Sequence, residues 1–253
     1  MDSRFYSHFY QPQTLWPKLR RNYCQLPQYY SFDLEKARQE FEQVCRQYPL
    51  KPFEFEGPGG KSRKRLSYQG LGLTSRVGPE SHYDALSLFE KHGKIDIYQT
   101  FKNVSDRLDP QDRHIPDLDE TKFNFLTSAC TPFFQEILGR FKSPSLKVRF
   151  LELKPGGIIP MHVDFPYYKG IRVHAALFSN PDVVWQVEDE SFAIPCDGNF
   201  YWFDTGKYHS VVNKGDTTRI VLSLNLSVYY DKEGNQRFSE NDSLFDLIEK
   251  QEI

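Results

Sequence analysis

A histidine and an aspartate stand two residues apart in the segment PMHVD, as His162 and Asp164, and a further histidine, His209, follows Asp164 by 45 residues. Residues i and i+2 of a β-strand project from the same face, so His162 and Asp164 should point together if this segment is a strand. Two imidazoles and one carboxylate in this pattern are the ligand set of a non-haem Fe(II) facial triad. Such a triad leaves coordination positions open for a cosubstrate and for dioxygen, so the spacing predicts an oxidative iron centre.

A fixed cation follows the second histidine closely in the sequence. Arg219 comes ten residues after His209, with the turn signal NKGD between them. We expect this turn to close a hairpin around Lys214 and to set His209 and Arg219 directly opposite one another, about 5 Å apart at Cβ. A guanidinium can hold a carboxylate at two points, so Arg219 is suited to the far carboxylate of a 2-oxo acid that chelates the metal through its other end.

The elements that must position these residues are short strands. From Leu146 onward the sequence alternates with period two and is punctuated by turn signals such as PGG, KG, NP and DG. Eight runs have this character: VRFLEL, GIIPMHVD, GIRVHAALF, DVVWQVED, SFAIP, NFYWFD, YHSVVN and TRIVLSLNLSVYY. So many short strands predict a double-stranded β-helix, which is a jelly-roll or cupin-like core.

The N-terminal part has a different texture. Apolar residues at helical spacing predict helices over about 31–48, with Asp33 as a cap, over 82–91, and over 120–141, where Pro132 would kink or restart the helix. A strand is expected over Leu66–Thr74. We therefore expect a mainly β protein with flanking α-helices. It would form a single domain, 1–253, in which 1–144 packs on a core over 145–230 and a short helix covers 240–253.

Composition bounds the class of protein. The 253 residues are 39% hydrophobic and 15% aromatic with a net charge of -2, which suits a folded core and gives no nucleic-acid footprint. The basic run Lys61–Arg65 is expected to be a solvated loop. The first residues show no signal pattern and no run is long enough to span a membrane. Four widely spaced cysteines suggest reduced thiols, so we expect a cytoplasmic protein.

The segments GIIPMHVD, IRVHAAL and NFYWFDTGKYHSVVNKGDTTRIVLSL together resemble the aspartyl/asparaginyl β-hydroxylase family of Fe(II)- and 2-oxoglutarate-dependent dioxygenases, including its proline hydroxylase members. The resemblance covers roughly 147–226. It implies that Arg219 holds the far carboxylate of 2-oxoglutarate, and that Arg172 and His174 contact this cosubstrate or position its metal-bound end. It also implies that iron is bound by His162, Asp164 and His209.

The chain departs from the animal members of that family at two positions. Those enzymes lack the acidic ligand, whereas this chain has Asp164, as the proline hydroxylases do. The serine that assists the arginine in the animal enzymes falls at Leu151, so another donor is expected to substitute for it.

The resemblance implies hydroxylation of a C–H bond in an amino acid, a peptide or a specialised metabolite, with iron, 2-oxoglutarate and dioxygen as cofactors. The expected partner is therefore a small molecule or peptide, with no nucleic acid and no membrane, and the oligomeric state stays open. Two alternatives remain: a non-catalytic cupin-type binding module, and a cupin metalloenzyme that does not use 2-oxoglutarate. Candidate substrate-facing residues, each of which could instead simply pack in the core, are Tyr167, Tyr168, Trp185 and Tyr68.

Overall fold

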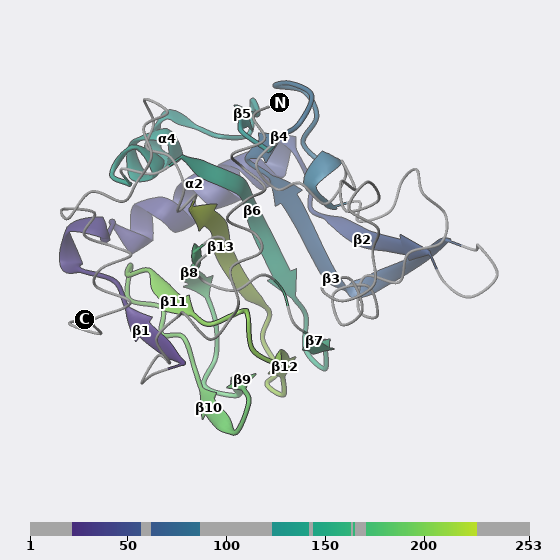
Figure 1. Ribbon diagram of the computed structural model, residues 1–253. Helices are drawn as coiled ribbons and strands as arrows, with labels where there is room; N and C mark the ends of the chain where they lie inside the picture. The colour runs from purple at the N-terminus through teal and green to yellow at the C-terminus, as the bar shows by residue number, and fades with distance from the viewer. Residues whose placement is uncertain are drawn as a thin grey trace, which may run out of the picture.

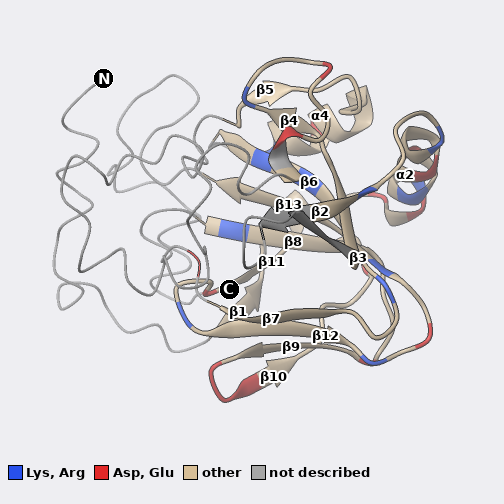
Figure 2. Cartoon of the chain, turned by 90° about the vertical axis from the view of Figure 1, so that its right-hand side faces the viewer, with Lys and Arg blue, Asp and Glu red and all other residues tan. Residues whose placement is uncertain are grey.

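Two antiparallel β-sheets form the body of the protein in the computed structural model (Figure 1), which describes residues 22–56, 62–86, 123–141, 144–162, 164 and 171–226. The large sheet has the strand order β1-β11-β8-β13-β6-β3-β2, and the small sheet has the order β10-β9-β12-β7. The view in Figure 2 shows the small sheet as a separate layer below the large one. The strands of the large sheet are β1 (Tyr23–Gln25), β11 (Tyr201–Phe203), β8 (Ile171–Phe178), β13 (Arg219–Leu226), β6 (Ser145–Leu153), β3 (Ser62–Gly72) and β2 (Lys51–Glu56). Those of the small sheet are β10 (Glu190–Phe192), β9 (Val183–Val187), β12 (His209–Asn213) and β7 (Ile158–His162).

All eight strands predicted from the period-two pattern are present as β6 to β13. Successive strands alternate between the two sheets except at the β9–β10 hairpin, which lies wholly in the small sheet, so the predicted double-stranded β-helix is confirmed. The strand expected over Leu66–Thr74 is also present, as part of β3 and the short β4 (Thr74–Ser75), which pairs with β5 (Phe125–Leu126).

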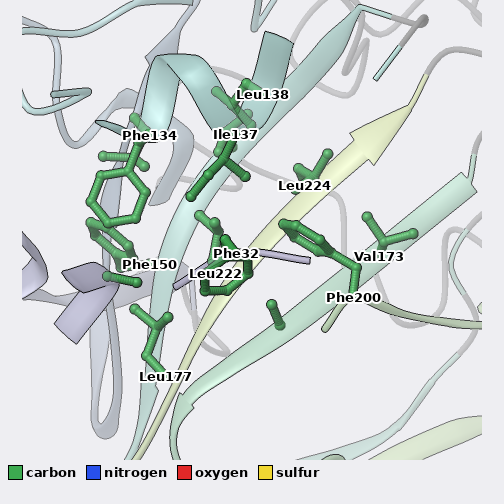
Figure 3. Packing of buried hydrophobic residues seen from close by; sticks show 14 of the residues in the cluster. Phe32, Phe134, Ile137, Leu138, Phe150, Val173, Leu177, Phe200, Leu222 and Leu224 are labelled. Carbon is green, nitrogen blue, oxygen red and sulfur yellow. The ribbon is translucent and has the colours of Figure 1, made fainter. Parts of the chain in front are cut away.

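The outer face of the large sheet packs against α2 (Leu34–Gln47) and α4 (Pro132–Gly139). Figure 3 shows this core, in which Phe134 of α4 meets Phe150 of β6 and Leu222 of β13 lies nearby. Phe150 is fully buried, with edge-to-face contacts to Phe41 at 4.9 Å and to Phe134 at 5.1 Å between ring centroids. The helices cover this face because it is apolar, which leaves the inner face for the polar residues of the site.

The predicted helices have mixed outcomes. Helix α2 confirms the first, and the Asp33 carboxylate caps it by accepting a 3.0 Å hydrogen bond from the Lys36 amide. Where the second helix was expected, over 82–91, the structure has a 3₁₀ turn over Asp84–Leu86, and 87–91 lie outside the described residues. The third is wrong over 123–131, because α4 begins at Pro132, which lacks an N–H and suits a first turn, and 120–122 lie outside the described residues. The helix expected over 240–253 also lies outside the described residues.

The hairpin expected around Lys214 does not form. Strand β13 is paired on both sides, by β6 and β8, so it has no free edge for β12, which instead pairs with β9 and β7 in the small sheet. His209 therefore lies opposite His162 and Val187, and Arg219 lies opposite Leu153. The turn signal is real, but it carries the chain from one sheet to the other.

Asn213 ties the two sheets together at this crossing. Its fully buried side chain donates hydrogen bonds to the Leu153 carbonyl at 2.9 Å and to the Thr217 carbonyl at 2.9 Å. Its amide oxygen accepts from the Gly215 N–H at 3.1 Å. A single amide thus fixes the end of β12, the connection and the end of β6.

The basic run Lys61–Arg65 is not the solvated loop that was expected, at least from Ser62 onward. Ser62 to Arg65 belong to β3 and pair with Phe53 to Glu56 of β2. Cross-strand pairing satisfies the backbone of these residues, so their charge does not prevent strand formation.

The cysteines form no disulfide. Burial raises the pKa of the Cys45 and Cys130 thiols to about 12, so both stay protonated at neutral pH. Among the described residues, no helix has the length and apolar character needed to cross a membrane.

The core makes a stability prediction at Phe150. Phe150→Ala should lower the free energy of unfolding by about 3–5 kcal/mol, because it leaves a cavity between two other aromatic rings. The measurement is urea unfolding followed by circular dichroism. Leu66→Ala, at a residue that is 67% exposed, is the control and should change stability by less than about 0.5 kcal/mol. Equal effects of the two variants would contradict this account of the core.

Candidate metal centre

Three potential ligands converge where the small sheet meets the connection that follows β7. His162 is the last residue of β7, His209 is the first of β12, and the two lie directly opposite each other. The Asp164 N–H donates to the Thr205 carbonyl at 2.8 Å, which holds the aspartate beside them. The ligand atoms of His162, Asp164 and His209 all lie within 4.8 Å of one another.

Both histidines are oriented for metal binding. The Nδ1 atom of His162 is 2.7 Å from the Pro160 carbonyl, and that of His209 is 2.9 Å from the Lys207 carbonyl. A carbonyl can only accept, so each Nδ1 carries the proton and each Nε2 keeps its lone pair. The two Nε2 atoms each lie 3.8 Å from an oxygen of Asp164. Burial, with His162 nearby, lowers the pKa of His209 to about 3, so its imidazole is neutral at physiological pH.

Arg172 of β8 is linked to the carboxylate of this group. Its Nη1 donates to Asp164 Oδ2, and its Nε donates to Asn225 Oδ1 at 2.9 Å. Arg172 and Asn225 lie opposite each other on neighbouring strands β8 and β13. The large sheet therefore orients the aspartate that stands between the two histidines of the small sheet.

His174 lies two residues further along β8 and is 4% exposed. Neither of its ring nitrogens has a hydrogen-bond partner among the described residues, and the same holds for the hydroxyl of Ser223, opposite it on β13. Burial, and then the positive charges of Arg219, Arg172 and Arg149, hold the pKa of His174 well below its usual value. His174 is thus a neutral imidazole with one donor and one acceptor available to a ligand.

Arg219 is the most unusual group of the site. It is 1% exposed, and none of its three guanidinium nitrogens has a hydrogen-bond partner within the described part of the chain. Its guanidinium carbon lies 4.7 Å from the centroid of the Trp185 ring, and the His174 ring lies 5.1 Å from the same indole. Burial lowers its pKa to about 10, so it still carries its charge at neutral pH. A buried cation of this kind calls for an anion.

The structure brings most of the residues predicted from the sequence together. The three ligands form one group, Arg172 contacts it, and His174 and Arg219 both lie against the ring of one tryptophan. That tryptophan, Trp185, is buried between the sheets, and Tyr68 lies on β3 in the large sheet. Tyr167 and Tyr168 lie outside the described residues.

Two residues of the site were not predicted, Ser223 and Asn225. They share the face of Arg219, because they follow it on β13 by four and six residues. Their even spacing from Arg219 in the sequence could have identified them. The hydrophobic residues between them, however, made the segment resemble an ordinary core strand.

Two histidines and one carboxylate that leave coordination positions open are the ligand set of non-haem Fe(II) oxygenases. The family model of the aspartyl/asparaginyl β-hydroxylases matches residues 121–227. The match confirms the predicted resemblance over the segment that carries the triad, Arg172, His174 and Arg219, and with it the prediction of an enzyme of the hydroxylase class.

Solved structures of low sequence identity are also similar to the chain. An oxidoreductase of the 2OG-Fe(II) oxygenase family from Burkholderia pseudomallei is 16% identical, with 86% of this chain and 89% of that one covered and a TM-score of 0.42. A prolyl-4-hydroxylase from Pseudomonas putida is 12% identical, with 82% and 94% covered and a TM-score of 0.42. A cupin domain from Bordetella pertussis is 19% identical, with 34% and 86% covered and a TM-score of 0.28. A search of curated proteins finds no match.

The geometry predicts which histidines bind metal. His162→Ala and His209→Ala should each weaken binding of Co(II), used as a spectroscopic probe, by more than roughly 100-fold, because each removes one of three ligands. Titration followed by visible absorption measures this. His82→Gln changes a buried histidine that contacts Ser128 instead, and it should leave the affinity unchanged. Full Co(II) affinity in either alanine variant would contradict the proposed ligand set.

The neutral state of His174 predicts a pH dependence of stability. The unfolded chain protonates this imidazole near its usual pKa of about 6.5, whereas the folded chain does so only at much lower pH. The unfolded state then binds more protons, so the free energy of unfolding should fall by up to about 1.4 kcal/mol per unit as the pH drops below 6.5. Urea unfolding of metal-free protein between pH 7 and 5 should show a shallower slope in His174→Gln. Identical slopes would show that His174 is already protonated in the folded state.

Proposed function

We propose that this protein is an Fe(II)- and 2-oxoglutarate-dependent dioxygenase that hydroxylates a C–H bond of an amino acid, a peptide or a specialised metabolite. The observation that carries the proposal is the Arg219 guanidinium, which is fully buried and has no acceptor among the described residues. It lies in the same interior as a two-histidine, one-carboxylate group. A dicarboxylate could pair with the guanidinium at one end and bind a metal held by this group at the other.

The donor set supports iron as the metal. His162, Asp164 and His209 offer two imidazole nitrogens and one carboxylate oxygen, a combination that suits Fe(II) and leaves room for other ligands. The chain has already selected the tautomers that a metal requires, through the carbonyls of Pro160 and Lys207. These three residues are therefore the ones that would hold iron.

The orphaned polar atoms support 2-oxoglutarate as the cosubstrate. Arg219 would pair with its far carboxylate, and His174, whose ring touches the same indole, would contact the end nearer the metal. Ser223 lies opposite His174 and four residues from Arg219, which is about 13 Å along a strand. An arginine side chain and a five-carbon dicarboxylate together span a distance of that order.

When bound, iron, 2-oxoglutarate and dioxygen supply the oxidation of the C–H bond. The residues of this chain contribute position and environment. Arg172 orients the Asp164 carboxylate, and Arg219 fixes the far end of the dicarboxylate by charge. The buried side chains of Phe203, Trp185 and Val187 surround the site and keep water from it.

The proposal predicts succinate formation that depends on 2-oxoglutarate. Wild-type protein with Fe(II) should release succinate, faster when a screen of amino acids, peptides and metabolites includes the substrate. Arg219→Leu should raise the KM for 2-oxoglutarate by roughly 100-fold or more, because it removes a buried charged partner. N-oxalylglycine, which mimics the cosubstrate, should inhibit.

Arg46→Leu, on the exposed face of α2, is the matched control and should leave the KM unchanged. Turnover without added iron would refute the scheme. Metal binding without any effect of 2-oxoglutarate or N-oxalylglycine would favour a cupin metalloenzyme of another kind, and the lack of metal binding would favour a non-catalytic binding module.

A further inference from the structure

Arg219 alone does not supply enough hydrogen-bond donors for a buried carboxylate bound beside it. A buried carboxylate has more lone pairs than one guanidinium satisfies, so a second donor is normal at such a site. On the strand beside Arg219, β6 presents Leu151 and Leu153 to the inner face, and both are buried and apolar. The next residue on that face of β13 itself is Val221. None of these three nearest positions on the inner face carries a hydrogen-bond donor.

The strand beyond β6 brings a hydroxyl to this place. Leu153 is paired with Arg219 of β13 on one side and with Tyr68 of β3 on the other, so the three residues form one row across the sheet. Residues in such a row point to the same face. Two strand spacings put the Cα atoms of Tyr68 and Arg219 about 10 Å apart, a distance that two long side chains can close.

The ring of Tyr68 is held in place by its neighbour. It stacks on Phe53 with 4.3 Å between centroids and an interplanar angle of 13°. Its hydroxyl makes no hydrogen bond to any described residue. The hydroxyl therefore belongs to the face of the sheet that Arg219 shares, and it is not committed to another described partner.

We propose that Tyr68 donates the second hydrogen bond to the far carboxylate of 2-oxoglutarate, beside Arg219. This inference rests on the proposed function and assigns Tyr68 to the cosubstrate, not to the substrate. Tyr68 lies outside the segment matched by the family model, so the N-terminal part of the chain completes the binding site of the C-terminal part.

The test separates the far carboxylate from the rest of the ligand. Tyr68→Phe removes only the hydroxyl and keeps the stacked ring. Dissociation constants for 2-oxoglutarate and for pyruvate, which lacks the far carboxylate, are measured by isothermal titration calorimetry on protein loaded with Mn(II) under anaerobic conditions. Tyr68→Phe should bind 2-oxoglutarate about tenfold more weakly and pyruvate as the wild type does. The thermal midpoint of each variant is recorded to verify folding.

Tyr23→Phe is the matched control. Tyr23 belongs to the same buried cluster and stacks on Phe192 at 3.8 Å, but it lies on β1, at the other end of the sheet. It should bind both ligands as the wild type does. Unchanged 2-oxoglutarate affinity in Tyr68→Phe, or an equal loss for both ligands, overturns the role of Tyr68. Wild-type protein that does not prefer 2-oxoglutarate to pyruvate overturns the proposed function as well, so the two failures are distinguishable.

Discussion

The site depends on the pairing that the buried positive charge of Arg219 requires with an anion. A guanidinium enclosed between two sheets, over the ring of Trp185 and with no hydrogen-bond partner among the described residues, is costly until an anion arrives. The fold tolerates this cost because β13 is paired on both sides and cannot move the residue toward solvent. The same rigidity keeps the charge at a fixed place relative to the metal ligands. The packing of the sheets thus holds a positive charge ready for an anion.

The two sheets divide the work of the site between them. The small sheet supplies His162 and His209, and the large sheet supplies Arg172, His174 and Arg219. The contact between Asp164 and Arg172 joins the two sets, since the carboxylate stands among the histidines while the guanidinium belongs to β8. Neither sheet alone carries all of these residues, so the site is complete only where the two sheets pack together.

Local patterns in the sequence predicted much of this structure. Period-two alternation identified all eight core strands, and the i, i+2 rule grouped His162 with Asp164. Pairing between distant strands could not be read in the same way. The hairpin between β12 and β13 was wrong because the neighbours of β13 are decided by the whole sheet. The helix before Pro132 was wrong because apolar residues at helical spacing also suit a short strand and a turn. The row that joins Tyr68 to Leu153 was equally hidden, because these residues lie 85 positions apart in the sequence.

The connection from β12 to β13 restricts the distance between two residues of the site. His209 and Arg219 are only ten residues apart, and Asn213 fastens the chain between them to the end of β6 and to the turn that follows. The separation between His209 and Arg219 is therefore limited by one short length of backbone that is fixed at its middle. If a dicarboxylate spans the site as proposed, this connection leaves little freedom to accommodate a diacid with one carbon more or fewer.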